Sequence, residues 1–461
     1  MPGFSRRHLG STAAAVAVAL SSTALFTAPA SAVTGDATPN GPGAIVKLSN
    51  TNGACSGVLI ATQWVLTSST CFPNTTPYTA PTAATTATLG RNDLTTGTDG
   101  HAVAVTALIT QQGRPIALAR LATPVTDVTI APLATTPPNP GDQIYIAGYG
   151  RTATAWVPDQ PHYATVTAGT PDTTTFPIST TTGPTTCKGD AGGPAWRTTT
   201  TGQPELLALH HTSWQGGCLG ETDTRTSATE TRIDDLHTTL TQQTTSPLLA
   251  RYLDLGGATS FLGAPTGTEY TIADGSAQDY QNGALYTSPA TGIHSVQGPI
   301  LSKYQEFHGP TGLGFPTTDQ NTTPDGIGHY NHFNRPDGAS IYWTPTTGAH
   351  EIQGTIRDKW ASLGWETGPG YPTTDETTTT DGTGKYNDFT NNTSIYWTPA
   401  TSVHPIYGTI RDTWISLGRE TSQLGYPTTD EYDNPGGRRM DFQHGTITWN
   451  ATTNTTQVSY S

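Results

Sequence analysis

Short apolar runs separated by turn residues recur between residues 44 and 236. Runs of this kind, bounded by Gly, Pro, Asn and Asp, are typical of β-strands. They recur too often, and helical spacing is too scarce, for anything but an all-β sandwich or barrel. We expect one short helix near the end of this region, within residues 231–240. The predicted strands lie in AIVKLSN, CSGVLIA, WVLTSS, VAVTALI, QIYIAGYG and ELLALHHTSW.

The second half of the chain follows another pattern, in which one unit recurs about every 54 residues. Residues 238–247, TTLTQQTTSP, have the composition of a linker between the halves. Each unit opens with apolar residues at i, i+4 and i+7, which form one face of a two-turn helix ended by glycine. These residues are Leu248/Tyr252/Leu255, Ile300/Tyr304/Phe307, Ile356/Trp360/Leu363 and Ile410/Trp414/Leu417.

Each unit continues with a turn that ends in proline and with a predicted hairpin. The second strand of the hairpin reads ALYTSP, SIYWTP, SIYWTP or TITW. Alternation puts neighbouring Tyr and Trp on opposite faces, so we expect one in the core and one exposed. His294, His350 and His404 close the first three units, and we expect satisfied turn residues there rather than metal ligands. One unit cannot bury its helix face alone and needs its neighbours.

The composition fits this picture of strands and turns. The chain has 461 residues, enough for two or three domains, with 50 Gly and 35 Pro. Its formal net charge is −14 with only 21 Lys and Arg, so it has no electrostatic footprint for nucleic acid or for an anionic membrane surface. No motif predicts a metal or a cofactor.

The first 32 residues have the pattern of a secretory signal peptide. Arg6 and Arg7 precede a short apolar run, and Ala30-Ser31-Ala32 forms an A-x-A cleavage site. The run is too short and too broken by Ser and Thr to span a membrane. The SRRHL segment also resembles a twin-arginine export signal, so both the Sec and the twin-arginine routes stay open. We therefore predict secretion, with cleavage after Ala32.

Four cysteines are present, at Cys55, Cys71, Cys187 and Cys218. An even count in a secreted chain indicates two disulfides, and the sequence alone permits three pairings. The local grouping favours Cys55–Cys71 and Cys187–Cys218. No CxxC or clustered Cys/His spacing supports the rival reading of a metal site.

Several ordered motifs of the first half resemble the trypsin/chymotrypsin family of serine proteases. The segment WVLTSSTC, residues 64–71, is similar to the family's WVLTAAHC, and AGYGR, residues 147–151, to its AGWGR. CKGDAGGP, residues 187–194, resembles the nucleophile loop, and SWQGGC, residues 213–218, the substrate strand that follows it. The resemblance implies two six-stranded β-barrels with a cleft between them, over residues 33–237, and agrees with both favoured disulfides.

The residues of the catalytic triad are absent at the matching positions. Thr70 stands where the family has histidine, Pro115 where it has aspartate and Ala191 where it has serine. The triad needs a nucleophilic hydroxyl, an imidazole base and a carboxylate that orients the base. Alanine offers no nucleophile, threonine no base near neutral pH, and proline no charge. We therefore expect that this domain is a pseudoprotease without catalytic activity.

Other parts of the family's site are retained. By the resemblance, Gly189 and Ala191 supply the backbone N–H groups of the oxyanion hole, which need no side chains. Asp190 matches the aspartate that pairs with the new N-terminus, which signal cleavage would leave at Val33; local backbone hydrogen bonds are the alternative. The specificity pocket would be formed by Thr185 at its base, with Ser213 and with Gln215, whose side chain would narrow the entrance.

A second catalytic set is the alternative to an inert domain. His210 and His211 precede Ser213, and a rescue by His211 with Ser213 or Ser69 would make the protein an endopeptidase or esterase of unorthodox chemistry. Ordinary strand residues with satisfied side chains are the simpler interpretation.

The repeats resemble the LGFP repeats of actinobacterial cell-envelope proteins, most literally at Leu313-Gly314-Phe315-Pro316. The resemblance implies attachment to the cell wall by four units. The four units are residues 248–297, 298–353, 354–407 and 408–461. Recurring aromatics could stack on wall sugars, although most are expected in the core. These aromatics are Tyr342, Trp343, Tyr396, Trp397 and Trp449.

These observations lead to one main hypothesis, a secreted pseudoprotease tethered to the envelope, with wall polysaccharide bound by the repeats and a peptide or protein held in the inert cleft. The active endopeptidase or esterase is the first alternative. A third interpretation makes the repeats the functional part and the barrels a passive spacer.

Overall fold

The computed structural model describes residues 44–91, 93–96, 99–180 and 185–461. The predicted signal peptide and its cleavage site lie outside these residues. The first half is two closed six-stranded barrels, joined in the strand orders β1-β2-β3-β6-β5-β4 and β10-β11-β12-β9-β8-β7. Their strands are β1 (Ile45–Asn50), β2 (Gly53–Ala61), β3 (Trp64–Ser68), β4 (Thr86–Leu89), β5 (His101–Thr110), β6 (Ile116–Leu121), β7 (Gln143–Gly148), β8 (His162–Ala168), β9 (Thr175–Ser179), β10 (Pro194–Thr198), β11 (Pro204–Ser213) and β12 (Ala228–Arg232).

The barrel prediction is confirmed, and the alternating pattern explains it. Apolar residues of each strand fill the barrel interiors, for example Leu48, Leu59 and Leu108 in the first barrel and Ile144 and Phe176 in the second. All neighbouring strands pair antiparallel, so one face of each packs inward and the other faces water or the second barrel. Both predicted disulfides are formed, Cys55–Cys71 and Cys187–Cys218.

The segment predicted as a linker, residues 238–247, is not an open linker. Its residues form helix α1 (His237–Thr245), which leads directly into helix α2 (Pro247–Asp254). Leu240 of α1 is fully buried in the same apolar cluster as Ile109 of the first barrel and Tyr252 of α2. The short helix expected within residues 231–240 overlaps α1 but begins later and continues to Thr245, where the threonine-rich composition gave no sign of it.

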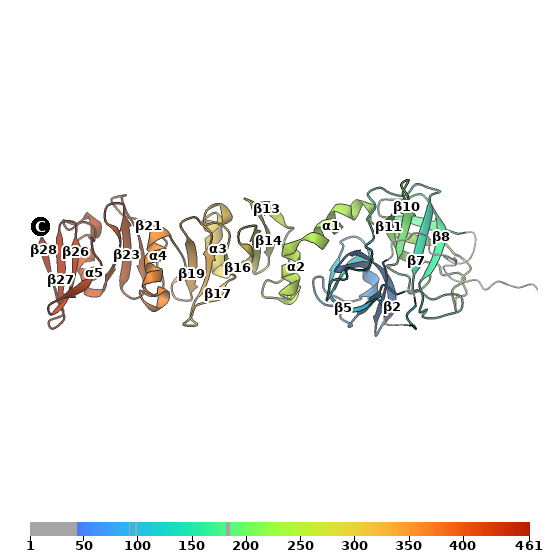
Figure 1. Ribbon diagram of the computed structural model, residues 1–461, viewed down its shortest axis with the longest axis horizontal. Coiled ribbons are helices and arrows are strands. Elements are labelled where there is room, and N and C mark those ends of the chain that lie inside the picture. The colour runs from blue at the N-terminus through green and yellow to red at the C-terminus, as the bar shows by residue number, and fades with distance from the viewer. Residues whose placement is uncertain (1–43, 92, 97–98, 181–184) are drawn as a thin grey trace, which may run out of the picture.

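The second half contains four sheets of four strands each, a larger element than the predicted hairpin (Figure 1). Two strands are added to the hairpin in each sheet. One edge strand has only two or three residues and carries no periodic signal, and the strand at the other edge has six. The elements are β13 (Tyr270–Ile272), β14 (Gly275–Tyr280), β15 (Gly283–Ser288), β16 (Gly292–Gln297), α3 (Gly298–Glu306), β17 (Asn321–Thr322), β18 (His329–Phe333), β19 (Ala339–Thr344), β20 (Gly348–Gln353), α4 (Gly354–Ser362), β21 (Thr377–Thr378), β22 (Lys385–Phe389), β23 (Thr393–Thr398), β24 (Ser402–Tyr407), α5 (Gly408–Ser416), β25 (Tyr432–Asn434), β26 (Gly437–Phe442), β27 (Gly445–Asn450) and β28 (Thr455–Tyr460).

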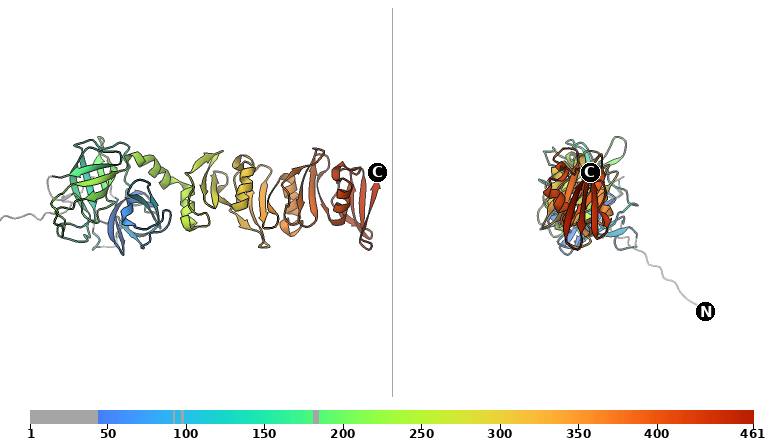
Figure 2. Two further views of the ribbon diagram at one scale, coloured as in Figure 1. Left: turned by 180° about the vertical axis from the view of Figure 1, so that it is seen from behind. Right: turned by 90° about the vertical axis from the view of Figure 1, so that its left-hand side faces the viewer.

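Helices and sheets alternate along one axis. Helix α3 packs against β16 of the sheet before it and against β19 and β20 of the sheet after it, and α4 and α5 repeat this arrangement. The result is a straight rod that projects from the barrels, with the C-terminus at the far end (Figures 1 and 2). Each helix buries two faces, so the units stabilise one another rather than folding separately.

One tyrosine of each sheet packs on the next helix. Tyr286 meets Tyr304, Tyr342 meets Trp360 and Tyr396 meets Trp414, all edge to face with ring centroids 4.7–5.2 Å apart. In the last unit the equivalent position, in the TITW segment, is Thr448. Thr448 lies on a sheet face against which no later helix of the described chain packs, and a polar side chain is compatible with that.

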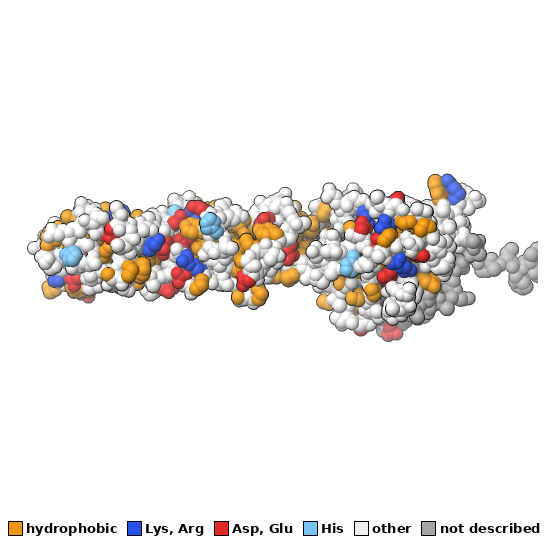
Figure 3. Space-filling model, turned by 90° about the horizontal axis from the view of Figure 1, so that it is seen from above, with side chains coloured by type: hydrophobic (Ala, Val, Ile, Leu, Met, Phe, Trp, Pro, Cys, Tyr) orange, Lys and Arg blue, Asp and Glu red, His pale blue; other side chains and the backbone are white. Residues whose placement is uncertain are grey.

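The visible surface mixes charges rather than grouping them. In Figure 3 cationic and acidic side chains lie interspersed along the rod and over the barrels. Within the described ranges, no helix is long and apolar enough to cross a membrane.

Candidate functional site

The three triad positions meet at one corner of the first barrel. The Ser68 hydroxyl and the Ser69 amide donate to the Pro115 carbonyl oxygen at 3.1 and 3.0 Å, beside Thr70. The Cys71 Sγ atom lies 3.7 Å from the Ala191 carbonyl oxygen. The chain therefore brings the three matched positions together, as the motifs predict.

The side chains at this corner carry little reactive chemistry. The Thr70 hydroxyl is hydrogen-bonded to the Ser68 hydroxyl at 2.8 Å. The Ala191 methyl packs against the apolar cluster that contains Cys71. Pro115 contributes a backbone acceptor only. No imidazole or carboxylate belongs to these three residues.

The backbone at Gly189 and Ala191, which is predicted to form the oxyanion hole, is held in place by its surroundings. Within the described part of the chain, the amides of Gly189 and Ala191 donate no hydrogen bond, so both stay available to a ligand oxygen. Gly189 has φ +102°, and a Cβ there would lie 2.9 Å from the Gly150 Cα atom. The position therefore requires glycine. The Cys187–Cys218 disulfide ties this loop to the strand beside it.

Asp190 lies completely buried behind this loop. Its carboxylate accepts the Gly150 amide at 2.7 Å and the Cys187 amide at 2.8 Å. Burial raises the pKa of Asp190, while nearby His210 and the two backbone donors oppose the rise. These contacts fit the alternative of local backbone bonding. Val33 lies outside the described residues, so docking of a new N-terminus stays a prediction.

The predicted pocket residues Thr185, Ser213 and Gln215 are each held by hydrogen bonds to neighbouring backbone. Thr185 is fully buried and donates to the Thr226 carbonyl at 2.6 Å, and the Ser213 hydroxyl donates to the Thr186 carbonyl at 2.5 Å. Gln215 has φ +61°, and its side-chain Oε1 accepts the Lys188 amide at 3.1 Å. This hydrogen-bond bridge joins Gln215 to the loop of residues 187–194, and narrowing of the pocket by Gln215 stays a prediction.

Arg151 reinforces the bridge. Its guanidinium donates to the Gln215 side chain at 2.7 Å and to the Leu219 carbonyl at 2.9 Å, and it pairs with Glu221. Outside this bridge two indoles are more than half exposed, Trp156 and Trp214, each with an arginine over its ring. The surface around this bridge therefore carries exposed aromatic and charged side chains.

The histidines considered for a second catalytic set have other partners. His210 is buried between the Glu230 carboxylate, 2.8 Å from Nδ1, and the Ala147 carbonyl, 3.1 Å from Nε2. Burial alone would lower the pKa of His210, but the Glu230 carboxylate raises it overall. Both ring nitrogens are occupied, so His210 cannot act as a base. His211 Nδ1 is buried without a partner in the described structure, and no described hydrogen bond joins it to Ser213 or Ser69.

The candidate aromatics of the repeats divide into two groups. Tyr342 and Tyr396 are only 3 % and 2 % exposed, so they are core residues and the prediction that they contact sugars is wrong. Trp343, Trp397 and Trp449 are half-buried, each against an apolar cluster shared by its own unit and the unit before it. The expected division of each Tyr-Trp pair is therefore confirmed for the buried tyrosines, and only the indoles keep accessible edges.

The aromatic residue of each turn at residues 313–316, 369–372 and 424–427 joins one unit to the unit before it. The Tyr371 hydroxyl contacts Asp325 and that of Tyr426 contacts Asp381, both at 2.6 Å. Phe315 has no hydroxyl, and its ring tip fills the space above Gly275, where a Cβ would lie 2.7 Å from the ring. These turns are joints of the rod.

A second joint uses the aspartate of the P-T-T-D segment, which sequence reasoning missed. Asp375 accepts Lys303 at 2.8 Å, the Glu351 amide at 2.9 Å and His350 Nδ1 at 3.3 Å. Burial opposes ionisation, but these donors lower the pKa of Asp375 to about 2. Asp319 and Asp430 repeat the contact with a cation and a histidine. The repetition of PTTD was the available signal, and it explains the three histidines as joint residues.

Comparison with family profiles agrees with this geometry. Residues 32–233 match the family described as Trypsin, and the segments 262–312, 313–368, 370–422 and 424–460 match the LGFP repeat. None of the curated proteins matches the chain.

Proposed function

The chain joins a trypsin-family domain to four LGFP repeats, and we propose that it is a secreted, envelope-attached binding protein whose protease domain is inert. The observation that carries the proposal is the corner of Thr70, Pro115 and Ala191. Loss of a catalytic triad costs a factor of about 10⁶ in turnover, and what remains comes from binding and the oxyanion hole. The domain would then hold a peptide or protein rather than cleave it.

The surroundings of this corner support binding without cleavage. The free amides of Gly189 and Ala191 can donate hydrogen bonds to a carbonyl or carboxylate oxygen of a ligand. Gln215, which holds the Lys188 amide, is expected to narrow the position where a substrate side chain would enter a specificity pocket. Trp156 and Trp214 supply apolar contact surface beside the cleft.

Secretion and wall attachment rest on separate support. Two disulfides suit an oxidising compartment, and residues 1–32 have the signal pattern. The LGFP repeats are typical of cell-envelope proteins, and the half-buried Trp343, Trp397 and Trp449 could present their edges to sugars. Wall polysaccharide is the proposed partner of the rod.

A fluorophosphonate probe tests the inert domain. We expect no labelling of the mature chain, residues 33–461, and no hydrolysis of casein or of ester substrates. Active trypsin serves as the positive control, and the triple variant Thr70→His, Pro115→Asp, Ala191→Ser shows whether the frame can still support chemistry. Labelling of the wild-type protein at Ser69 or Ser213 would establish the alternative, an endopeptidase or esterase with a non-standard catalytic set.

Co-sedimentation with purified actinobacterial cell wall tests attachment. The whole mature chain should pellet with the wall, and replacing Trp343, Trp397 and Trp449 by alanine should reduce the pelleted fraction. Trp156→Ala, on the barrel surface, is the matched control, and melting curves exclude unfolding. If wild-type protein stays in the supernatant, the proposed attachment to the wall is wrong. The interpretation that makes the repeats the functional part, with the barrels as a spacer, is then wrong as well.

A further inference from the structure

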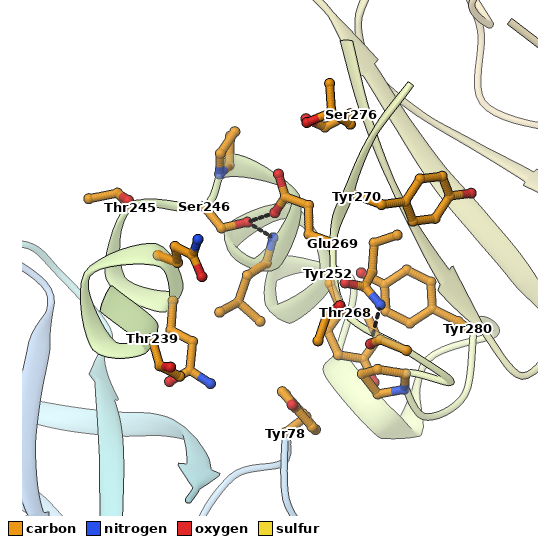
Figure 4. A pocket seen from close by; sticks show the side chains of 18 residues that line it. Tyr78, Thr239, Thr245, Ser246, Tyr252, Thr268, Glu269, Tyr270, Ser276 and Tyr280 are labelled. Atoms are coloured by element: carbon orange, nitrogen blue, oxygen red, sulfur yellow. Dashed lines mark hydrogen bonds between the residues drawn. The ribbon is translucent and has the colours of Figure 1, made fainter. Parts of the chain in front are cut away.

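A groove of about 440 Å³ lies where the first barrel, helices α1 and α2, and the first repeat sheet meet. In Figure 4, Thr239 and Thr245 of α1 lie on one side and Thr268 and Glu269 on the other, with Tyr78 below. Its volume is within the range of small-ligand sites. Because three structural parts contribute, no single repeat contains it.

The floor of the groove is an aromatic ladder. Tyr78, from the loop after β3, meets Tyr252 of α2 edge to face at 5.8 Å, and Tyr252 stacks on Tyr280 at 4.4 Å. Tyr78 has φ +63°, which is unfavourable for a bulky residue. Its carbonyl accepts the Ala258 amide at 3.2 Å, so the joint holds it in place. The groove is therefore formed before any ligand arrives.

The rim is polar but almost uncharged. The 18 described lining residues include Ser, Thr, Gln and Tyr side chains but no Lys, Arg or His, and Glu269 is the single carboxylate among them. The Glu269 carboxylate accepts the Ser246 hydroxyl at 2.6 Å. The side chains of Thr239, Gln242, Thr268 and Ser276 make no hydrogen bond within the described structure, so they offer both donors and acceptors.

We propose that this groove binds a neutral oligosaccharide. A sugar chain presents hydroxyl groups that both donate and accept, and carbon faces that pack on aromatic rings, which matches this rim and the exposed ring of Tyr270. Anionic ligands have no cation to meet here, and a purely apolar ligand would leave the amides and hydroxyls unpaired. The groove includes barrel and α1 residues, so the proposal does not depend on wall binding by the repeats.

Calorimetric titration of the mature chain tests the proposal, with cellohexaose, maltohexaose, mannohexaose and an arabinan hexamer as probes. At least one should bind, and Gln242→Ala and Tyr270→Ala should each weaken binding about tenfold or more. Thr241→Ala, next to Gln242 but outside the groove, is one control. Tyr432→Ala is the other, because Tyr432 occupies the place of Tyr270 in the last unit, with 39 % against 38 % exposure and the same hydroxyl contact to an aspartate.

The titrations distinguish support for the sugar-binding groove from its rejection. Binding lost in both groove variants and kept in both controls supports the proposal. It is overturned if none of the four sugars binds, if the groove variants bind as wild type does, or if tetralysine binds instead and Glu269→Gln removes that binding. Wall co-sedimentation of the same variants reports the repeats separately, so failure of one function is distinguishable from failure of the other.

Discussion

Glu351 shows at the residue scale how the rod depends on protonation. It has no exposed surface, and neither carboxyl oxygen has a partner in the described structure. Burial, with Glu376 nearby, raises the pKa of Glu351 from 4.5 to about 8. The folded protein therefore keeps this carboxyl protonated at neutral pH, inside the joint formed by the second and third units.

The sign of the pH effect follows from that raised pKa. The contribution of Glu351 to stability is complete below pH 4.5, declines as pH rises and is lost by about pH 8. Glu351→Gln removes the titration but keeps the shape. We expect its melting temperature to exceed that of the wild type by at least ~2 °C at pH 9, with no excess at pH 4.

Thermal melting between pH 4 and pH 9 measures this difference. Asp274→Asn, at an exposed carboxylate in a turn of the first sheet, is the matched control and should follow the wild type throughout. A constant offset between Glu351→Gln and the wild type would contradict the argument, because a purely steric effect does not vary with pH.

At the scale of elements, much of the architecture could be predicted. The i, i+4, i+7 pattern located helices α2 to α5, and their first two apolar residues are buried, as in Ile356 and Trp360. The motifs located the triad corner. The expected glycine at each helix end holds for three units, but His308 takes the left-handed position in the second. The joints were missed because they depend on pairs such as Asp375 and Lys303, 72 residues apart, which no local pattern reveals.

Exchanging phenylalanine and tyrosine at the joints is expected to destabilise the rod in both directions, for two different reasons. Tyr426→Phe removes contacts to Asp381 and Thr379, leaving both groups without this partner, and should destabilise the last unit by about 1–2 kcal/mol. Phe315→Tyr should also destabilise, because its ring tip already fills the space over Gly275 and a hydroxyl has no room there.

Hydrogen exchange measured on the two variants locates each effect. Protection should fall around β25–β28 in Tyr426→Phe and around β13–β16 in Phe315→Tyr. If Phe315→Tyr exchanged as slowly as the wild type, the close fit over Gly275 would not be what selects phenylalanine.

At the scale of the whole molecule, one apolar cluster runs from the first barrel through α1 and α2 into the first sheet. It contains Leu66 and Ile109 of the barrel, Leu240 and Tyr252 of the helices, and Leu285 of the sheet. The two halves are therefore expected to move as one body in solution, although the composition predicted a linker.

Insertion of four Gly-Ser residues after Thr245 tests this continuity. The insertion should separate α1 from α2, so that small-angle X-ray scattering shows a broader distribution of distances and melting changes from one transition to two. The same insertion in the loop after Thr199, which lies on the barrel surface, should leave both measurements unchanged. An unaltered scattering curve for the first insertion would mean that the halves are already independent.

The alternation of helix and sheet has a consequence for reach. Every unit repeats the same order of helix and sheet, although the joints differ in detail, so each added unit lengthens the rod without rearranging the others. The number of units therefore sets the distance between the trypsin-like domain and any surface that binds the far end of the rod. Gene duplication or loss within the array would change that distance by whole units.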